Sequence, residues 1–193
     1  FNRKIPFLNF FLKKELIYVP ILGLCWWALD FPFMTRTSKS QLKKNPKLRG
    51  KDLETTRKAC EKFKEMPVTV VNFVEGTRFT QSKHAKQQSP FPHLLKPKAG
   101  GIAFVMQAMG EQISQVVNVT LHYPDGIPTF MDFAGGKVKN INVHVNVMPV
   151  SDELIGDYTG DSEFRVRFQS ELNRLWEEKE QTLQSLDAPT STK

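Results

Sequence analysis

Apolar and polar residues follow different periods along the chain, and each period predicts a different kind of element. From Val68 to Val74 nearly every residue is apolar, which is typical of a strand buried on both faces of a parallel or mixed sheet. A second apolar strand is predicted from Val116 to Leu121. From Lys137 to Val147 the residue types alternate, which predicts a half-buried strand whose solvated face carries His144.

A helical period appears in three other segments. Asp52 is a candidate N-cap for a helix that places Leu53, Cys60 and Phe63 on one face. The segment from Ala99 to Met109 is also predicted to be helical. A last helix begins near Asp161 or Ser162, either of which can cap it, and its apolar stripe comprises Phe164, Phe168, Leu172, Leu175 and Trp176.

The segment from Thr80 to Lys98 has no clear period and contains three prolines, so it predicts a long surface loop of the kind that often carries function. Strands and helices otherwise alternate, which favours an α/β fold. We expect a single domain over residues 1–184, with a mixed, mostly parallel central sheet flanked by helices. Residues 185–193 are predicted to form a polar tail.

The first thirty residues are unusually apolar. The run from Leu16 to Leu29 includes Trp26 and Trp27, but it is shorter than the ~20 residues that cross a bilayer. Pro20 and Gly23 also interrupt a simple helix there. Two interpretations remain open: the segment packs into the core, or it lies at a membrane interface, where Trp, Phe and Lys are favoured together.

Composition narrows the possible partners. The chain has 193 residues and a net charge of +7, so anionic partners are favoured over cationic ones. The basic residues are dispersed and no nucleic-acid fold signature is present, so nucleic acid is not expected as a partner. Cys25 and Cys60 lack paired spacing, so we expect free thiols and no metal site. Because residue 1 is Phe, the chain is interpreted as a fragment or a processed product.

The first apolar strand stops abruptly at Glu75-Gly76-Thr77-Arg78. In α/β sheets, ligands gather at the carboxyl ends of strands. Gly76 allows a positive φ and a close backbone approach, Thr77 offers a hydroxyl, and a guanidinium such as that of Arg78 grips phosphate through two parallel hydrogen bonds. Glu75 would orient Arg78, a backbone amide or a substrate hydroxyl. The alternative interpretation is an ordinary loop with a Glu–Arg ion pair.

The stretch Phe73 to Thr80, FVEGTRFT, resembles the third motif of the glycerolipid acyltransferases, which are the 1-acylglycerol-3-phosphate (lysophosphatidate) acyltransferases and their relatives. Further segments resemble other parts of that family in the expected order, so the resemblance covers most of the chain. They are Lys13 to Leu16 followed by Val19 to Gly23, Ala28 to Arg36, and Lys96 to Gly101. The resemblance implies a glycerolipid acyltransferase-like fold.

Two features depart from the family pattern. The fourth motif usually has a proline in an apolar strand, and the comparable strand here, Val116 to Leu121, has Asn118 near that place. The first motif, a His followed five positions later by an Asp, is absent, because none of the four histidines has an Asp at that spacing. The family places this motif upstream of the segment at Lys13, so in this chain the motif is expected shortly before Phe1. No catalytic residue is therefore assigned in this chain, and we expect the chain alone to be inactive.

The resemblance implies an O-acyltransferase that transfers a fatty acyl group from acyl-CoA or acyl carrier protein to the hydroxyl of a lysophospholipid such as 1-acyl-glycerol-3-phosphate. It implies no cofactor beyond the acyl donor and no metal. It also implies association with a membrane surface at the cytoplasmic face, which is the inner membrane in a bacterium. The residues expected to bind the substrate phosphate are Glu75, Gly76, Thr77, Arg78, Arg36 and Lys13.

A second function remains open. The basic charge and the Trp-rich N-terminal segment are also typical of a non-catalytic module that binds lipid or a membrane.

Overall fold

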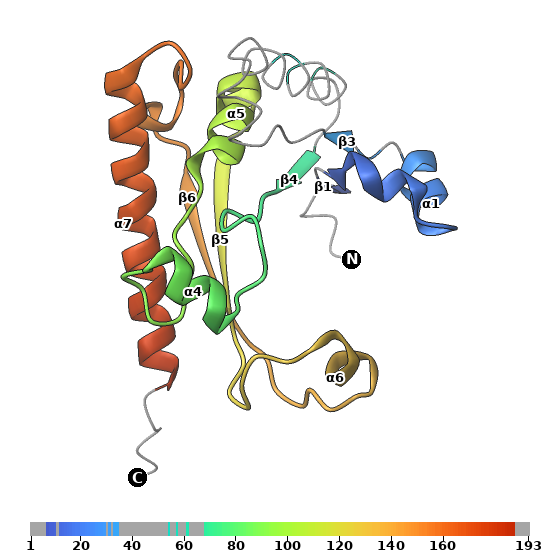
Figure 1. Ribbon diagram of the computed structural model, residues 1–193. Coiled ribbons are helices and arrows are strands. Elements are labelled where there is room, and N and C mark those ends of the chain that lie inside the picture. The colour runs from blue at the N-terminus through green and yellow to red at the C-terminus, as the bar shows by residue number, and fades with distance from the viewer. Residues whose placement is uncertain are drawn as a thin grey trace.

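The computed structural model describes residues 7–10, 12–29, 31, 33–34, 54, 57, 61 and 68–187. The N-terminal part consists of short elements (Figure 1). These are β1 (Phe7–Phe10), β2 (Leu12–Lys13), the 3-10 helix η1 (Lys14–Tyr18), α1 (Leu22–Ala28) and β3 (Phe33–Met34). The expected helix from Asp52 lies mostly outside the described residues, although Glu54, Arg57 and Glu61 are helical.

The rest of the chain alternates strands and helices. In order they are β4 (Val68–Val71), α4 (Gln81–Gln87), α5 (Ala99–Met109), η2 (Gly110–Gln112), β5 (Gln115–His122), α6 (Phe130–Ala134), β6 (Asn142–Pro149), η3 (Asp152–Leu154) and α7 (Ser162–Asp187). A single small domain that mixes helix and sheet is confirmed. The strand predicted from Val116 to Leu121 and the helix predicted from Ala99 to Met109 are also confirmed.

The expected central sheet is not formed by the described residues. Their strands make three separate pairs: β1 with β4 and β2 with β3 are parallel, whereas β5 with β6 is antiparallel. The antiparallel pair arises because residues 123–141 return the chain as a hairpin, while a parallel pairing needs a crossover connection. The expectation of one mostly parallel sheet is therefore corrected.

β4 is shorter and more exposed to solvent than the apolar run from Val68 to Val74 predicts. β4 ends at Val71, its described side chains are only half-buried, and Phe73 is 74% exposed. Among the described strands β4 pairs only with β1, so one of its edges has no described strand beside it. On one side Val70 packs against the buried Val105 and Met109 of α5.

The alternating strand, β6, is not half-buried. Val143, Val145 and Val147 are 52–56% exposed, because no described residue covers that face of the β5–β6 pair. α7 contacts β5, and the side chains buried on β5 belong to Thr120 and His122. The expectation that His144 faces solvent is confirmed.

The main core lies between α5, α7 and the segment 89–98, and Figure 1 shows α7 standing along the β5–β6 pair. The predicted stripe of α7 is buried from Phe164 to Trp176, with Leu175 only partly buried. Asp161 caps the helix, since its Oδ1 accepts from the N–H groups of Glu163 at 2.8 Å and Phe164 at 3.0 Å. α7 continues to Asp187, so the first residues of the expected tail are helical.

The segment predicted as a loop contains a helix. The Oγ1 atom of Thr80 accepts from the N–H of Lys83 at 3.3 Å and caps α4, and Gln88 ends the helix in the left-handed region with φ of 49°. The following segment 89–98 has no regular secondary structure and bends at residues 90–93, but it is not a surface loop, because Phe91, Leu94 and Leu95 are buried. Its apolar residues pack where a surface loop would carry polar ones.

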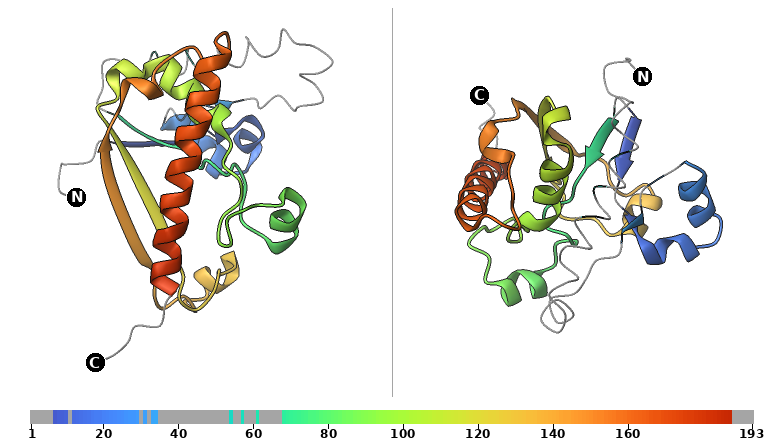
Figure 2. Two further views of the ribbon diagram at one scale, coloured as in Figure 1. Left: turned by 90° about the vertical axis from the view of Figure 1, so that its left-hand side faces the viewer. Right: turned by 90° about the horizontal axis from the view of Figure 1, so that it is seen from above.

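Several residues of the apolar N-terminal run from Leu16 to Leu29 are exposed and do not belong to the core. Ile21 is 79% exposed, Leu24 67% and Trp27 64%, whereas Gly23 is buried. Within the described parts of the chain, no helix has both the length and the apolar character needed to span a bilayer. Figures 1 and 2 place α1 on the side of the molecule opposite α7.

Candidate functional site

The turn after β4 has a backbone that depends on glycine. Gly76 has φ of 67°, in the left-handed region that strains other residues, and its N–H donates to the carbonyl of Phe73 at 2.8 Å. The N–H of Lys98 donates to the carbonyl of Val74 at 2.9 Å. These bonds place the turn beside the end of the segment 89–98.

Glu75 is hydrogen-bonded to the neighbouring segment 89–98. Its Oε1 accepts from the N–H of Leu95 at 3.0 Å, and Leu95 is fully buried. Burial raises the pKa of Glu75, while the Leu95 bond and the charges of Lys179 and Lys98 act in the opposite direction. Of the three tasks left open by the sequence, the structure therefore supports the orientation of a backbone amide. Among the described residues, Glu75 and Arg78 form no ion pair.

Lys179 of α7 lies near Glu75 and was not identified from the sequence. Its Nζ donates to Asn118 Oδ1 at 2.8 Å and to the carbonyl of Val119 at 2.6 Å, and it lies 5.7 Å from the centre of the Trp176 ring. Burial lowers the pKa of Lys179 to about 8, and the charge of Glu75 opposes that shift. The side-chain oxygen of Asn118, on β5, accepts a hydrogen bond from this lysine.

The other face of the turn carries two positive side chains. Lys83 of α4 donates from Nζ to Thr77 Oγ1 at 2.9 Å and to the carbonyl of Arg78 at 3.1 Å. The guanidinium of Arg78 is exposed and makes no ion pair or hydrogen bond within the described part of the chain. Lys83 was missed because the sequence suggested a loop there, and only α4 brings it back over Thr77.

The remaining expected phosphate ligands are not brought to this turn by the described structure. Lys13 ends β2, opposite Met34 of β3. Arg36 lies outside the described residues. Arg78 lines neither the hollow at the hairpin 123–141 nor the hollow beside α1. Its side chain is exposed, and its role as a phosphate ligand stays a prediction.

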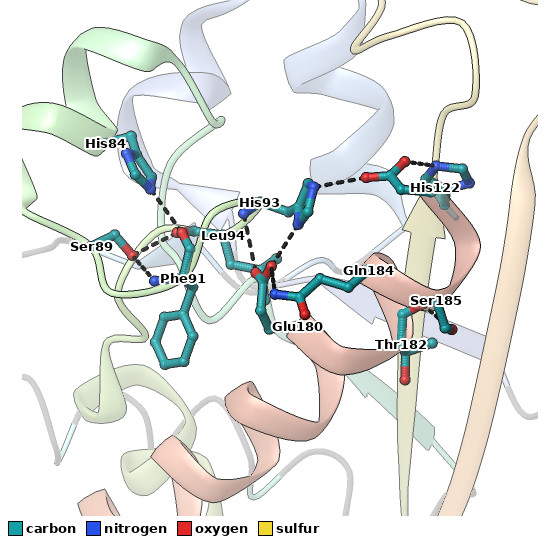
Figure 3. Close-up of polar contacts among 11 residues, drawn as sticks. His84, Ser89, Phe91, His93, Leu94, His122, Glu180, Thr182, Gln184 and Ser185 are labelled. Carbon is teal, nitrogen blue, oxygen red and sulfur yellow. Dashed lines mark hydrogen bonds and ion pairs between the residues drawn. The ribbon is translucent and has the colours of Figure 1, made fainter. Parts of the chain in front are cut away.

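A polar network anchors the segment 89–98 to the end of α7 (Figure 3). Glu180 is 5% exposed, and its carboxylate accepts from the backbone N–H of His93 at 3.1 Å and from His93 Nδ1 at 2.6 Å. Asp187 lies 2.7 Å from Nε2 of His93 and 2.6 Å from Nε2 of His122. Two histidines therefore hold the segment, α7 and β5 together.

Other contacts complete the anchoring of this segment. His84 Nε2 lies 2.7 Å from the carbonyl of Phe91, and the hydroxyl of Ser89 donates to the carbonyl of Leu94 at 2.7 Å. The indole N–H of Trp176 donates to the carbonyl of Leu95 at 2.9 Å. Because Leu95 also donates to Glu75, the turn is connected to α7 through both polar groups of one buried residue.

Comparison with known proteins identifies the family. A family model described as Acyltransferase matches residues 2–124. The chain is 28% identical over 151 residues to "1-acyl-sn-glycerol-3-phosphate acyltransferase delta" of Mus musculus, covering 72% of this chain and 37% of that protein. It is 26% identical over 167 residues to "1-acyl-sn-glycerol-3-phosphate acyltransferase 3" of Arabidopsis thaliana, covering 78% and 42% respectively.

A third relative is "1-acyl-sn-glycerol-3-phosphate acyltransferase gamma" of Mus musculus, 24% identical over 179 residues that cover 87% of this chain and 43% of the relative. The chain thus spans about two fifths of the length of these curated relatives. No solved structure matches it. Since the family match includes the Gly76 turn and extends over well over half of the residues, the chain belongs to the Acyltransferase family.

Proposed function

We propose that the protein is an O-acyltransferase that moves a fatty acyl group from acyl-CoA or acyl carrier protein to the hydroxyl of a lysophospholipid such as 1-acyl-glycerol-3-phosphate, in phospholipid synthesis or remodelling. The observation that carries the proposal is the turn at Gly76 in a chain of this family, where Arg78 is exposed and the Lys83 ammonium group donates to the backbone carbonyl of Arg78. The relatives' names, which specify 1-acyl-sn-glycerol-3-phosphate, support this choice of acceptor.

In this proposal the acceptor phosphate docks on Arg78. A guanidinium without a partner among the described residues keeps its N–H groups for the two phosphate oxygens that it can bind in parallel. Gly76 lets the backbone approach the phosphate, and Lys83 holds Thr77 and the Arg78 carbonyl in place. Lys13 and Arg36 are proposed as further phosphate ligands, and Glu75 acts through the Leu95 amide.

The chemical step needs a general base that this chain is not expected to contain. In the proposal, the His of a His-x4-Asp motif upstream of Phe1 removes the proton from the acceptor hydroxyl, whose oxygen attacks the thioester carbonyl. The thiol of the donor leaves as the new ester forms. General-base catalysis contributes roughly 10²–10⁴-fold to such a rate. No metal and no cofactor other than the acyl donor takes part, and we expect residues 1–193 alone to be inactive.

The acceptor and the product are lipids, so the proposal places the protein at a membrane surface, and the family resemblance suggests its cytoplasmic face. The exposed apolar side chains of α1 support this placement, because Leu24 and Trp27 present apolar surface to the surroundings.

The decisive test is Arg78→Ala in the full-length protein. Loss of a charge partner for a phosphate costs ~2–5 kcal/mol, and the exposure of Arg78 puts the expected loss near about 2 kcal/mol, roughly thirtyfold in kcat/KM for lysophosphatidate. Arg78→Lys should recover part of it. Lys86→Ala, on the exposed face of α4, is the matched control and should change little.

A phosphate role also predicts that the loss depends on the acceptor. With a monoacylglycerol, which has no phosphate, Arg78→Ala should leave kcat/KM close to that of the parent enzyme. An unchanged kcat/KM for lysophosphatidate would remove Arg78 from the site.

The exposed apolar surface of α1 also favours the second candidate, a non-catalytic module that binds lipid or a membrane. Vesicle flotation combined with an acyl-transfer assay separates the two functions. A full-length protein that floats with anionic vesicles but transfers no acyl group from either donor would support the module.

A further inference from the structure

The hairpin that joins β5 to β6, residues 123–141, displays large apolar side chains to solvent; we call it the α6 hairpin. Ile127 is 64% exposed, Phe130 67%, Met131 73% and Phe133 64%. α6 lies wholly within the described range 68–187 and has no buried residue. Soluble surfaces carry such side chains singly, so four of them on one short segment indicate a contact surface.

The α6 hairpin keeps its shape without these side chains. Thr129 Oγ1 accepts from the N–H of Asp132 at 3.2 Å, while Asp132 Oδ2 accepts from the N–H of Thr129 at 3.0 Å, which completes a capping box. Lys137 closes the hairpin through its N–H, which donates to the Asp132 carbonyl at 2.9 Å, and through an ion pair of 3.4 Å to Asp132 Oδ1. These polar bonds cap α6 and close the hairpin that carries the apolar side chains.

The size of this surface and the charge of the chain favour a bilayer as its partner. Side chains of this kind bury roughly 150–250 Å² each, so four that are about two thirds exposed offer on the order of 500 Å². A specific protein interface buries about 800 Å² per partner and requires a complementary surface, whereas a bilayer accepts a small protruding wedge. The net charge of +7 of the chain complements anionic headgroups, whereas the hairpin itself is neutral, with Asp125 and Asp132 against Lys137 and Lys139.

The position of the α6 hairpin agrees with this partner. In Figures 1 and 2, α6 projects from the end of the β5–β6 pair and lies on the side opposite α7, as α1 does. α1 exposes Leu24 and Trp27. Two apolar displays, far apart in sequence, therefore lie on one side of the molecule.

We propose that the α6 hairpin is a second membrane contact, which inserts Phe130, Met131 and Phe133 among the headgroups and upper acyl chains of an anionic phospholipid bilayer. This inference rests on the proposed function only in that a lipid acceptor brings the enzyme to a bilayer. The contact itself is a property of the hairpin and is measurable without turnover.

The direct test places a fluorophore on the hairpin. In the full-length protein, with other cysteines including Cys25 and Cys60 replaced by serine, Met131→Cys is labelled with nitrobenzoxadiazole and mixed with phosphatidylcholine vesicles containing phosphatidylglycerol. We expect a blue shift of its emission and quenching by spin-labelled lipid. Val166→Cys is the matched control, because Val166 is 67% exposed on α7, and it should show neither effect.

Each other outcome overturns the proposal. A label at Met131 that spin-labelled lipid does not quench excludes insertion. Equal quenching at Val166 shows that the protein meets lipid without a specific hairpin contact. A blue shift that needs no vesicles and grows with protein concentration assigns the surface to a second copy of the chain.

A second arm uses Phe130→Ser/Phe133→Ser, which removes no buried side chain. Each phenyl ring that leaves the interface should weaken vesicle partitioning roughly tenfold, so the apparent KM for vesicle-borne lysophosphatidate should rise by about 10- to 100-fold. The KM for a short-chain, water-soluble acceptor should stay the same. If the enzyme acylates neither acceptor, the proposed function fails while the labelling arm still decides the membrane contact. Equal KM values for variant and parent on vesicles would refute the inference.

Discussion

Replacing Glu75 in two ways separates its hydrogen bond from its charge. Glu75→Gln keeps an Oε1 acceptor for the N–H of Leu95. Glu75→Ala leaves that N–H unpaired, and Leu95 is fully buried. An unsatisfied buried donor costs ~1–3 kcal/mol. We therefore expect Glu75→Ala to lose about that much free energy of unfolding, and Glu75→Gln to stay within about 1 kcal/mol of the parent protein.

Urea unfolding measures this difference. With an m-value of about 2 kcal/mol/M, the alanine variant should unfold at a midpoint roughly 0.5–1.5 M lower than the parent. The sign of the pH dependence gives a second readout. Because burial raises the pKa of Glu75, the parent loses stability as pH rises through that pKa, and Glu75→Gln does not. The stability of Glu75→Gln relative to the parent should therefore increase from acid to neutral pH.

The charge of Glu75 is tested by a double-mutant cycle with Lys179→Met. Since the two charges interact across a partly solvated space, we expect a coupling of about 0.5–1 kcal/mol after allowance for screening. The same cycle with Lys86→Met should be additive, because Lys86 is exposed on α4. If Glu75→Ala unfolds at the same urea concentration as Glu75→Gln, the Leu95 bond does not anchor the turn and the reasoning fails.

Three further predictions follow from neighbouring contacts. Lys83→Met should lower kcat/KM for lysophosphatidate several-fold, and Lys83→Arg should restore it, because either cation can hold Thr77; equal rates for both variants would contradict that role. Glu180→Ala leaves the donors of His93 unpaired and should cost about 3 kcal/mol, seen in calorimetry as a Tm lower by roughly 6–12 °C, and an unchanged Tm would dismiss the network. Burial lowers the pKa of Lys179 to about 8 from 10.5, so the folded state releases this proton first; parent stability should rise relative to Lys179→Met between those pH values, and parallel pH curves would show otherwise.

Many of the features that were predicted correctly depend only on residues that are close together in the sequence. The spacing of Phe164, Phe168 and Leu172 places them on one face of any helix, and Asp161 satisfies the first N–H groups of that helix from its own side chain. The positive φ of Gly76 likewise follows from a residue that lacks Cβ at a sharp turn. The ordered motifs also identified the family, since they are properties of the chain itself.

The hydrogen-bond and charge partners of the candidate site could not be predicted from the sequence in the same way. Glu75 was expected to orient Arg78, an amide or a hydroxyl, and only the packing of the segment 89–98 selected the amide of Leu95. Lys179 is far from Glu75 in the sequence and stands near it because α7 packs against β5. The capping role of Thr80, although local, was hidden by the absence of an apolar period in α4.

By itself, then, the sequence determined which side chains share a face, where the helix with an apolar stripe starts and where the backbone turns at Gly76, because those depend on neighbours within one or two turns of chain. Only the tertiary structure decided what each face meets. The valines of β6 alternate as a buried strand would, yet they remain exposed, because α7 packs on the opposite face of the hairpin. Periodicity specifies the direction of a side chain, whereas burial depends on a second element arriving there.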